Sequence, residues 1–378
     1  NRPAGTINQT YAVGAVTGNS DVGGLVGSDA GTVNDSYWDT ETSGQTTSAA
    51  GIGLTTIQMT GLNATVEMYR FDFEGAWRPR EGDYPELARR SPYADGGEAY
   101  DDLVDGDGSA GDPYRVTTVY ELQRMDWHLD AEFELQNDVN ATNTSEWYDG
   151  DGFDPIGEVG GEFAGKFDGG GHAIDGLTID RPGSDGVGLF GVVGEGVIDI
   201  SRVGLTGVNV TGDDSVGALI GNSTNASVSD VTVTGGRVEG RGDSVGGLVG
   251  RLNTTLPIEV LVDAHVTLEN VTGTENVGGL VGETDPQTAV TIANVSATAV
   301  VEGQRTVGGL VGRHYFHRIE NATSSGTVNA SSAGNANAGG LVGHFGIGSS
   351  QTRLIDSDSN VTVSSPGGNV GGLAGLVE

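Results

Sequence analysis

One hexapeptide recurs along this chain at a nearly fixed spacing. It reads Val-Gly-Gly-Leu-Val-Gly at residues 277–282. It recurs, exactly or with small changes, at Val22, Val187, Val216, Val245, Val307, Ala338 and Val370. From residue 187 onward, successive copies start 29, 29, 32, 30, 31 and 32 residues apart. A period near thirty residues is typical of a repeat protein in which each repeat is one supersecondary unit.

A second apolar segment precedes each hexapeptide, as at residues 198–203, 228–233 and 292–295. Val, Ile and Thr alternate there with polar residues, which is typical of half-buried strands. One such unit cannot bury its own apolar face, whereas stacked units bury it against one another. The sequence therefore predicts an all-β fold, a parallel β-solenoid (β-helix) of about 30-residue glycine-rich repeats with irregular capping segments. The hexapeptide glycines permit positive φ, and they let neighbouring backbones approach closely.

The hexapeptide in units of about thirty residues resembles the GLUG repeat of bacterial and archaeal surface proteins. Residues 153–191, which include Phe-Asp-Pro-Ile-Gly at 153–157 and Gly-Leu-Phe-Gly at 188–191, resemble the segment that opens such arrays. Residues 37–45 and 53–59 resemble the segment that closes them. The resemblance implies a secreted or surface-displayed, adhesin-like protein, and it supplies no catalytic residue.

Five segments are expected along the chain. They are a single terminal repeat at 1–30, a closing cap at 31–92, an Asp/Gly-rich linker at 93–111, an opening cap at 112–180 and the solenoid repeats at 181–378. The period breaks after residue 30, where aromatic residues replace the repeat pattern. Within the caps we expect a helical turn at 55–59, a short helix at 119–125 and a strand at 133–135.

The order of these segments places a closing cap before the array that it would close. Eight residues separate Val370 from Glu378, so the Val22 of a second copy placed after this one would lie thirty residues beyond Val370. We therefore expect residues 1–92 of one copy to complete the array of another at its 370–378 end. The copies are either tandem parts of a longer chain or head-to-tail subunits of a filament.

Acidic residues outnumber basic ones by 52 to 18, and Lys166 is the only lysine. A formal charge of −34 indicates a high-salt environment and a halophilic archaeon as the source, because salt screens the self-repulsion. An acidic surface at ordinary salt is the alternative. The charge argues against a nucleic-acid partner, and no apolar run is long enough for membrane insertion. The sequence begins at Asn1 without a signal peptide, as expected of a processed form or a fragment, and it holds no cysteine for a disulfide or thiolate site.

Two catalytic motif matches are interpreted as repeat turns. Residues 242–246 fit the pattern G-x-S-x-G of a nucleophile elbow, and residues 186–191 fit G-x-G-x-x-G, with no helix expected to follow. Some parallel β-helices act on polysaccharides through clustered carboxylates and a basic partner. Here lysine is nearly absent and no acidic column is expected to repeat, so the chain is not predicted to be an enzyme.

Two Asp-Gly clusters, with Asp105 and Asp107 in one and Asp149 and Asp151 in the other, resemble calcium loops in their oxygen donors. Neither cluster continues as an EF-hand, so acidic turns are expected, with calcium binding as the alternative and no other cofactor. His314 and His317 are three residues apart and flanked by arginines. An exposed loop is expected there rather than a metal site.

Asn-x-Ser/Thr sequons are more frequent than about one asparagine in five, the share expected by chance from the Ser and Thr content. Fourteen of the twenty-one asparagines carry one, which predicts N-glycosylation of an exported protein. The candidates are Asn8, Asn34, Asn63, Asn140, Asn143, Asn209, Asn222, Asn225, Asn253, Asn270, Asn294, Asn321, Asn329 and Asn360. For Asn8, Asn294 and Asn321 the alternative is a ladder of stacked amide side chains within the repeat.

Together these patterns predict a structural subunit of an extracellular or cell-surface filament, assembled head-to-tail by continuing the solenoid between copies. The alternative is an adhesin stalk or a carbohydrate- or cell-binding module built from tandem copies. In that case the aromatic loops at His314–His317 and Trp147-Tyr148 would carry the recognition.

Overall fold

The computed structural model describes residues 5–28, 31–71, 73, 77–80, 83–87, 103, 105–194, 198–254, 259–286, 291–315, 318–346 and 352–378. The chain divides into two compact units, residues 1–100 (unit 1) and residues 101–378 (unit 2). Each unit is described by itself. Among the described residues, no helix combines the length and the apolar character needed to cross a membrane.

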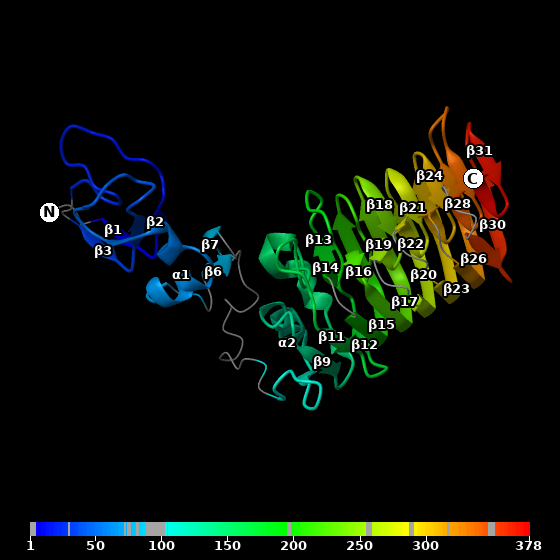
Figure 1. The fold of residues 1–378 in the computed structure, drawn as a ribbon, viewed down its shortest axis with the longest axis horizontal. Helices are drawn as coiled ribbons and strands as arrows, with labels where there is room; N and C mark the ends of the chain where they lie inside the picture. The colour runs from blue at the N-terminus through cyan, green and yellow to red at the C-terminus, as the bar shows by residue number, and fades with distance from the viewer. Residues whose placement is uncertain are drawn as a thin grey trace. The chain divides into compact units, whose positions relative to one another are not determined.

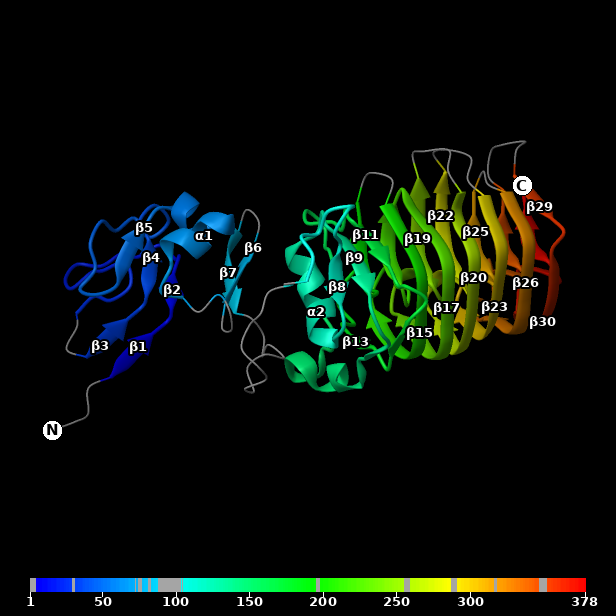
Figure 2. The same cartoon turned by 90° about the horizontal axis from the view of Figure 1, so that it is seen from below.

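Unit 2 is a parallel β-solenoid in which successive turns, called rungs here, stack in chain order (Figures 1 and 2). The predicted fold class is therefore confirmed. Within the repeats, the first sheet, which also includes the strands of the opening cap, holds β15 (Ile198–Gly212), β17 (Ala226–Gly240), β20 (Glu259–Thr272), β23 (Thr291–Gly303), β26 (Arg318–Ala330), β29 (Arg353–Ile355) and β30 (Asp358–Ser364). Each pairs in parallel with the strand one rung away, as with Ile292 opposite Ile319.

Two narrower parallel sheets complete the rungs. One holds β18 (Asp243–Gly246), β21 (Glu275–Gly278), β24 (Thr306–Gly308), β27 (Asn337–Gly339) and β31 (Asn369–Gly371). The other holds β14 (Phe190–Val193), β16 (Ile220–Thr224), β19 (Val249–Thr254), β22 (Val281–Pro286), β25 (Val311–His314), β28 (Val342–Phe345) and β32 (Ala374–Val377). The hexapeptide forms the corner between them, and its leucine points inward, so Leu280 and Leu310 are fully buried.

The hexapeptide glycines are required by close backbone approach. A Cβ on Gly279 would lie 2.2 Å from the Gly309 carbonyl oxygen of the next rung, and one on Gly278 would lie 2.0 Å from the Val281 carbonyl oxygen. Neither glycine has a positive φ, so close approach and not backbone conformation requires glycine here. The left-handed residue is the one before the hexapeptide, Asn276, with φ of 55°.

A second left-handed corner bends each long strand of the first sheet. It falls on Asn294 (φ 56°), Asn321 (φ 48°) and Asp356 (φ 46°), and on the equivalent residues Arg202, Asp230 and Asp263. Asn and Asp tolerate this conformation better than most side chains do. The inward and outward alternation shifts at this corner, so Ile292 before it and Val295 after it are both buried.

The opening cap precedes the array within unit 2. Its elements are β8 (Tyr114–Val116), α2 (Val119–Arg124), η2 (Met125–Trp127), β9 (Glu132–Leu135), β10 (Val139–Asn140), η3 (Thr142–Gly150), β11 (Lys166–Asp168), β12 (Ala173–Asp175) and β13 (Thr178–Asp180). Phe133 of β9 stacks on Phe167 of β11, which stacks on Ile200 of β15. Thr118 and Glu121 form a capping box at the start of α2. The expected helix at 119–125 and strand at 133–135 are confirmed.

Unit 1 holds short parallel strands under an aromatic cap. Its elements are β1 (Thr6–Asn8), β2 (Tyr11–Ala12), β3 (Thr32–Asn34), β4 (Tyr37–Asp39), β5 (Ile52–Leu54), η1 (Thr56–Met59), α1 (Gly61–Glu67), β6 (Trp77–Arg80) and β7 (Asp83–Leu87). β1 pairs with β3, and β2 pairs with β4, which pairs with β5. Parallel stacking therefore continues beyond residue 30, where the sequence pattern breaks. The expected helical turn at 55–59 is confirmed as η1.

The hexapeptide corner yields a test of the solenoid geometry. In Gly279→Ala the added methyl group would overlap the Gly309 carbonyl oxygen, so we expect unit 2 to lose about 1–3 kcal/mol of unfolding free energy. Gly334→Ala is the control, because a Cβ there meets no atom within 4 Å. Thermal unfolding in molar salt, followed by circular dichroism, measures both. Equal melting temperatures would contradict the backbone approach described here.

Candidate assembly site

The last rung of unit 2 leaves apolar side chains uncovered. Val370, Leu373 and Val377 are 50%, 46% and 65% exposed, whereas Leu341, one rung earlier, is fully buried. Among the described strands, β30, β31 and β32 each pair with a neighbour on one side. An open parallel edge with exposed apolar residues is a template for a further strand.

The first rung of unit 1 also has an unpaired edge among the described strands. β1 and β2 each have one described strand neighbour, β3 and β4. Ile7 is 37% exposed on this side. The corner residue between the two strands is Gln9, with φ of 48°, and Asp35 occupies the same corner one rung later with φ of 45°. Unit 1 thus repeats the left-handed corner of the array in unit 2.

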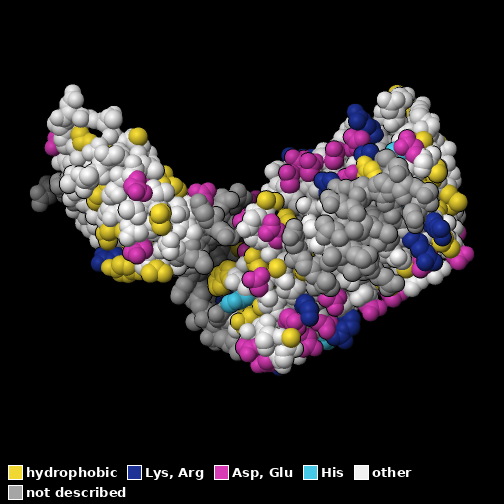
Figure 3. Space-filling model, viewed as in Figure 1, with side chains coloured by type: hydrophobic (Ala, Val, Ile, Leu, Met, Phe, Trp, Pro, Cys, Tyr) yellow, Lys and Arg dark blue, Asp and Glu magenta, His cyan; other side chains and the backbone are white. Residues whose placement is uncertain are grey.

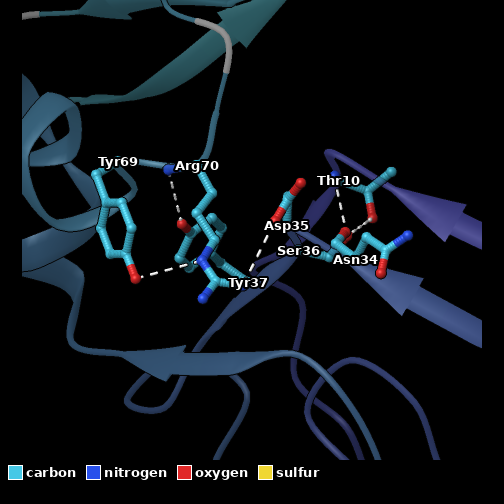
Figure 4. Close-up of polar contacts among 7 residues, drawn as sticks. All are labelled: Thr10, Asn34, Asp35, Ser36, Tyr37, Tyr69 and Arg70. Carbon is cyan, nitrogen blue, oxygen red and sulfur yellow. Dashed lines mark hydrogen bonds and ion pairs between the residues drawn. The ribbon is translucent and has the colours of Figure 1, made fainter.

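The two units also share the hydrogen bonds around this corner. In unit 1, the Thr10 N–H donates to Ser36 Oγ over 3.3 Å, and that hydroxyl donates to the Asn34 carbonyl over 2.6 Å (Figure 4). In unit 2, the Ala322 N–H donates to Ser357 Oγ over 3.1 Å, and that hydroxyl donates to the Ile355 carbonyl over 2.7 Å. The serine that follows a left-handed corner therefore plays one role in both stacks.

The side chain of Tyr37, in the second rung of unit 1, is covered. Tyr37 is fully buried, and its hydroxyl accepts the N–H of Arg70 over 3.2 Å. Arg70 also pairs with Asp35 over 3.5 Å and donates from Nε to the Tyr69 hydroxyl over 3.2 Å (Figure 4). Burial is the main cause that raises the pKa of Tyr37, which therefore stays neutral. Among the described strands of unit 1, β4 is paired on both sides, whereas β1, β2 and β3 each have one strand neighbour.

A buried carboxylate ties the cap to the strands of unit 1. Asp39 is fully buried, and its oxygens accept the N–H groups of Glu41 and Thr42 over 2.7 and 3.0 Å. They also accept the hydroxyls of Thr56 and Tyr84 over 2.7 and 2.6 Å. Burial by itself raises the pKa of Asp39, but these hydrogen bonds outweigh it and hold the pKa below its ordinary value.

Acidic residues form a column along one rim of unit 2, contrary to the expectation that no acidic column repeats. The Asp214 N–H donates to Asp185 Oδ1 over 3.2 Å, and the Asp243 N–H donates to Asp214 Oδ1 over 2.6 Å. Glu275 lies opposite Asp243 in the next rung, and Arg305 ends the column with a 3.2 Å ion pair to Glu275. Figure 3 shows acidic side chains gathered on this rim. Burial, and then the neighbouring Glu275 and Asp214, raise the pKa of Asp243.

Two predicted recognition residues are buried, which corrects the expectation of exposed loops. His314 is fully buried in β25 and stacks on Phe345 with ring centroids 5.6 Å apart. It continues the inward column that holds Thr284 one rung earlier. Its position two residues after the last hexapeptide glycine is the sequence signal for its burial. Trp147 is 6% exposed and stacks on Tyr120. His317 lies outside the described residues.

The calcium candidates do not converge in the described residues, where no three His, Asp or Glu side chains are placed to hold a metal ion. Asp105 pairs with Arg115 over 2.7 Å. Asp107 accepts the Ser109 N–H over 3.0 Å, and the hydrogen bonds from Ser109 lower its pKa. Asp151 lies beside η3, and the side chain of Asp149 lies outside the described residues.

The sequons occupy unlike environments. The exposed ones are Asn8, Asn34, Asn63, Asn140, Asn143, Asn270, Asn294, Asn321 and Asn360, and the half-buried ones are Asn209, Asn222, Asn253 and Asn329. Asn225 is 3% exposed, which leaves no room for a sugar and removes it as a candidate. Asn321 donates its side-chain amide to Asn294 Oδ1 over 3.1 Å, so these two form the ladder contact expected as the alternative.

The nucleophile-elbow match is part of the repeat. Ser244 is buried with φ of 62°, and its hydroxyl donates to Glu283 Oε2 over 2.9 Å. The match at residues 186–191 leads into strand β14 rather than a helix. Neither motif therefore has the surroundings that its chemistry needs.

Comparison with known proteins identifies the repeat. The family described as the GLUG motif matches residues 303–329, which confirms the predicted resemblance to GLUG repeats. Halomucin of Haloquadratum walsbyi is 37% identical over 179 residues, which cover 45% of this chain and 2% of that protein. A Gly-rich membrane protein of Evansella cellulosilytica is 33% identical over 123 residues, covering 31% of this chain and 14% of that protein.

Two further likenesses concern proteins named as immunoglobulin A1 proteases. The one from Streptococcus sanguinis is 33% identical over 151 residues, covering 38% of this chain and 8% of that protein. A crystal structure of one from Bacteroides ovatus has 16% identity and a TM-score of 0.38, covering 72% of this chain and 86% of that chain. That TM-score is too low to bear on function. The chain spans a small part of each relative in sequence, so their whole-protein activities are not assigned to it.

The Asp39 cluster makes the stability of unit 1 depend on pH. Because its folded pKa lies below the unfolded value, the carboxylate contributes stability above about pH 4, and this is lost as the pH falls through the folded pKa. Tyr84→Phe removes one charged hydrogen bond and should cost about 1.5–3 kcal/mol at neutral pH. Tyr69→Phe, at a 66% exposed side chain, is the control. Near-ultraviolet circular dichroism of the aromatic cap measures both, and equal losses would contradict this role.

The acidic column predicts a stabilising substitution. The pKa of Asp243 is raised in the folded state, first by burial and then by Glu275 and Asp214, so its ionised form opposes folding at neutral pH, and Asp243→Asn removes both the buried charge and the repulsion. We expect a gain of about 0.2–1 kcal/mol at low salt that shrinks in molar salt, where screening is strong. Glu146→Gln removes one charge outside the column as the control. A gain that does not depend on salt would contradict the electrostatic explanation.

Proposed function

We propose that this protein is a structural, non-enzymatic component of the cell surface or extracellular layer of a halophile. Its copies join head-to-tail, with the first rung of unit 1 continuing the solenoid at the last rung of another copy. The observation that supports this is the presence of two edges that could complement each other. One is the exposed apolar edge at Val370, Leu373 and Val377, and the other is the GLUG-type rung of unit 1 with its own cap.

The composition and the relatives support the setting. A charge of −34 with a single lysine suits concentrated salt, and halomucin of Haloquadratum walsbyi is among the similar proteins. Similarity to a Gly-rich membrane protein supports a location at the cell surface. The exposed sequons are the proposed glycan sites, among them Asn63, Asn143 and Asn360.

The mechanism is mechanical. Each rung contributes parallel backbone hydrogen bonds and continues apolar columns such as Ile292, Ile319 and Leu354. Neighbouring strands lie about 4.8 Å apart, so a joint that preserves these columns would transmit the stiffness of one solenoid to the next. A head-to-tail contact that does not close on itself forms a filament.

An adhesin stalk or glycan-binding module is the alternative. Trp127 of η2 is 56% exposed, and exposed aromatic side chains suit sugar and cell-surface recognition. The two aromatic segments expected to carry recognition give this alternative less support, because His314 and Trp147 are buried. The head-to-tail joint is favoured because it accounts for both exposed edges.

Negative-stain electron microscopy in molar salt tests the assembly. The 378-residue chain should form filaments with an axial repeat on the order of several nanometres, from rungs about 4.8 Å apart. Leu373→Glu adds a carboxylate at the exposed edge and should yield single particles. Val159→Glu is the control, at an 84% exposed residue of the opening cap, and should still form filaments. Single particles from the unchanged chain at all concentrations would contradict the joint.

A further inference from the structure

We infer that Asn63 carries an N-linked glycan, and that this glycan covers apolar side chains on the helical cap of unit 1. This rests on the proposed function, which places glycans on exposed sequons of an exported protein. Asn63 lies in the first turn of α1 and is exposed, and Thr65 completes its sequon. Among the candidates, this site is distinguished by the apolar surface around it.

Two of the most exposed apolar side chains in the described structure flank Asn63. Ile57 of η1 is 71% exposed, and Val66 of α1 is 70% exposed. Tyr69, three residues beyond Val66, is 66% exposed. Single exposed apolar residues are common, but several around one point indicate a surface that something covers. Among the described residues between 160 and 369, no large apolar side chain is exposed, so the sequons of the array lack such neighbours.

The contacts of Asn63 place its amide between these apolar residues. Asn63 donates from Nδ2 to the Ile57 carbonyl oxygen over 3.2 Å, which brings the amide beside η1. Val66 lies three residues further along α1, and it is therefore on the same face of the helix as Asn63. A glycan attached to Nδ2 would begin between Ile57 and Val66.

Attachment of a glycan uses one of the two amide hydrogens and leaves the other. Nδ2 of Asn63 forms a bond to the anomeric carbon of a glycan on a phosphate-bearing donor. The carbon–oxygen bond of the donor breaks, its electron pair leaves on the phosphate oxygen, and one amide proton is released. The remaining N–H still donates to the Ile57 carbonyl oxygen, so the contact that orients the amide would also orient the first sugar.

The role of this glycan follows from the screening of charge by salt. The charge of −34 keeps copies apart at low salt, but in molar salt the Debye length is about 3 Å and the repulsion is screened. Exposed apolar side chains such as Ile57 and Val66 would then promote contacts between the caps of different copies. A bulky, hydrated glycan over these side chains would prevent those contacts.

Mass spectrometry tests the site in the full chain, secreted by a halophilic archaeal host that N-glycosylates its own exported proteins. Cleavage after glutamate gives the fragment 42–67, in which Asn63 is the only asparagine. We expect a glycan on this fragment in the unchanged chain and in Thr65→Ser, and none in Asn63→Gln or Thr65→Ala. Asn360→Gln removes a sequon of the array and should leave the fragment 42–67 glycosylated.

The outcomes separate this inference from the proposed function. An unmodified fragment 42–67 in a chain that carries glycans at other sequons would overturn the inference. A chain without any glycan would overturn the inference together with the glycosylation included in the proposed function. Head-to-tail assembly would still stand if that chain formed filaments under the electron microscope.

The fluorescence of Nile red in molar salt tests the covering role. Asn63→Gln from the same host should bind about twofold more dye than the glycosylated chain, because Ile57 and Val66 are uncovered. Adding Ile57→Thr and Val66→Thr should remove that excess. Asn63→Gln made in a bacterium without N-glycosylation is the control, and it should bind as much dye as the unchanged chain from that bacterium. Equal binding by Asn63→Gln and the glycosylated chain would overturn the covering role.

Discussion

The backbones of successive rungs approach so closely at the hexapeptide corners that a side chain does not fit there. Gly247, Gly279, Gly309 and Gly340 each face a carbonyl oxygen of the following rung at a distance that excludes Cβ. This contact brings the buried leucines of successive rungs into one column. The glycine content of the chain, 66 residues, follows in part from this repeated contact.

The spacing of the hexapeptide and the alternation of Val, Ile and Thr were enough to predict parallel stacked rungs. The left-handed corners were not predicted, because Asn294 and Asn321 also fit a glycan site and an amide ladder. The available signal was a polar residue two positions after an inward residue of the first sheet, as with Asn294 after Ile292. His314 was misread because flanking arginines suggest a loop, whereas its alternation with the hexapeptide places it inward. Burial of Trp147 depends on stacking against Tyr120 and Phe153, which no local pattern reveals.

The acidic column was not predicted from the sequence, because the repeats differ in length and their charged positions are hard to align. Asp185, Asp214, Asp243 and Glu275 each lie two residues before a hexapeptide, but Arg305 takes the position in the next rung and conceals the pattern. Like charges stacked along one rim weaken the fold at low salt, and Asp243 shows this in its raised pKa.

Hydrogen–deuterium exchange measured against protein concentration tests most directly the central claim that these edges complete one another. In molar salt, amides of Thr6–Asn8, Tyr11–Ala12, Arg353–Ile355 and Ala374–Val377 should exchange readily in dilute protein and become protected in concentrated protein. Protection in the inner strands, such as β20 and β23, should stay constant. The account predicts that both edges gain protection together. Edge amides that exchange equally fast at every concentration, while the inner strands stay protected, would contradict it.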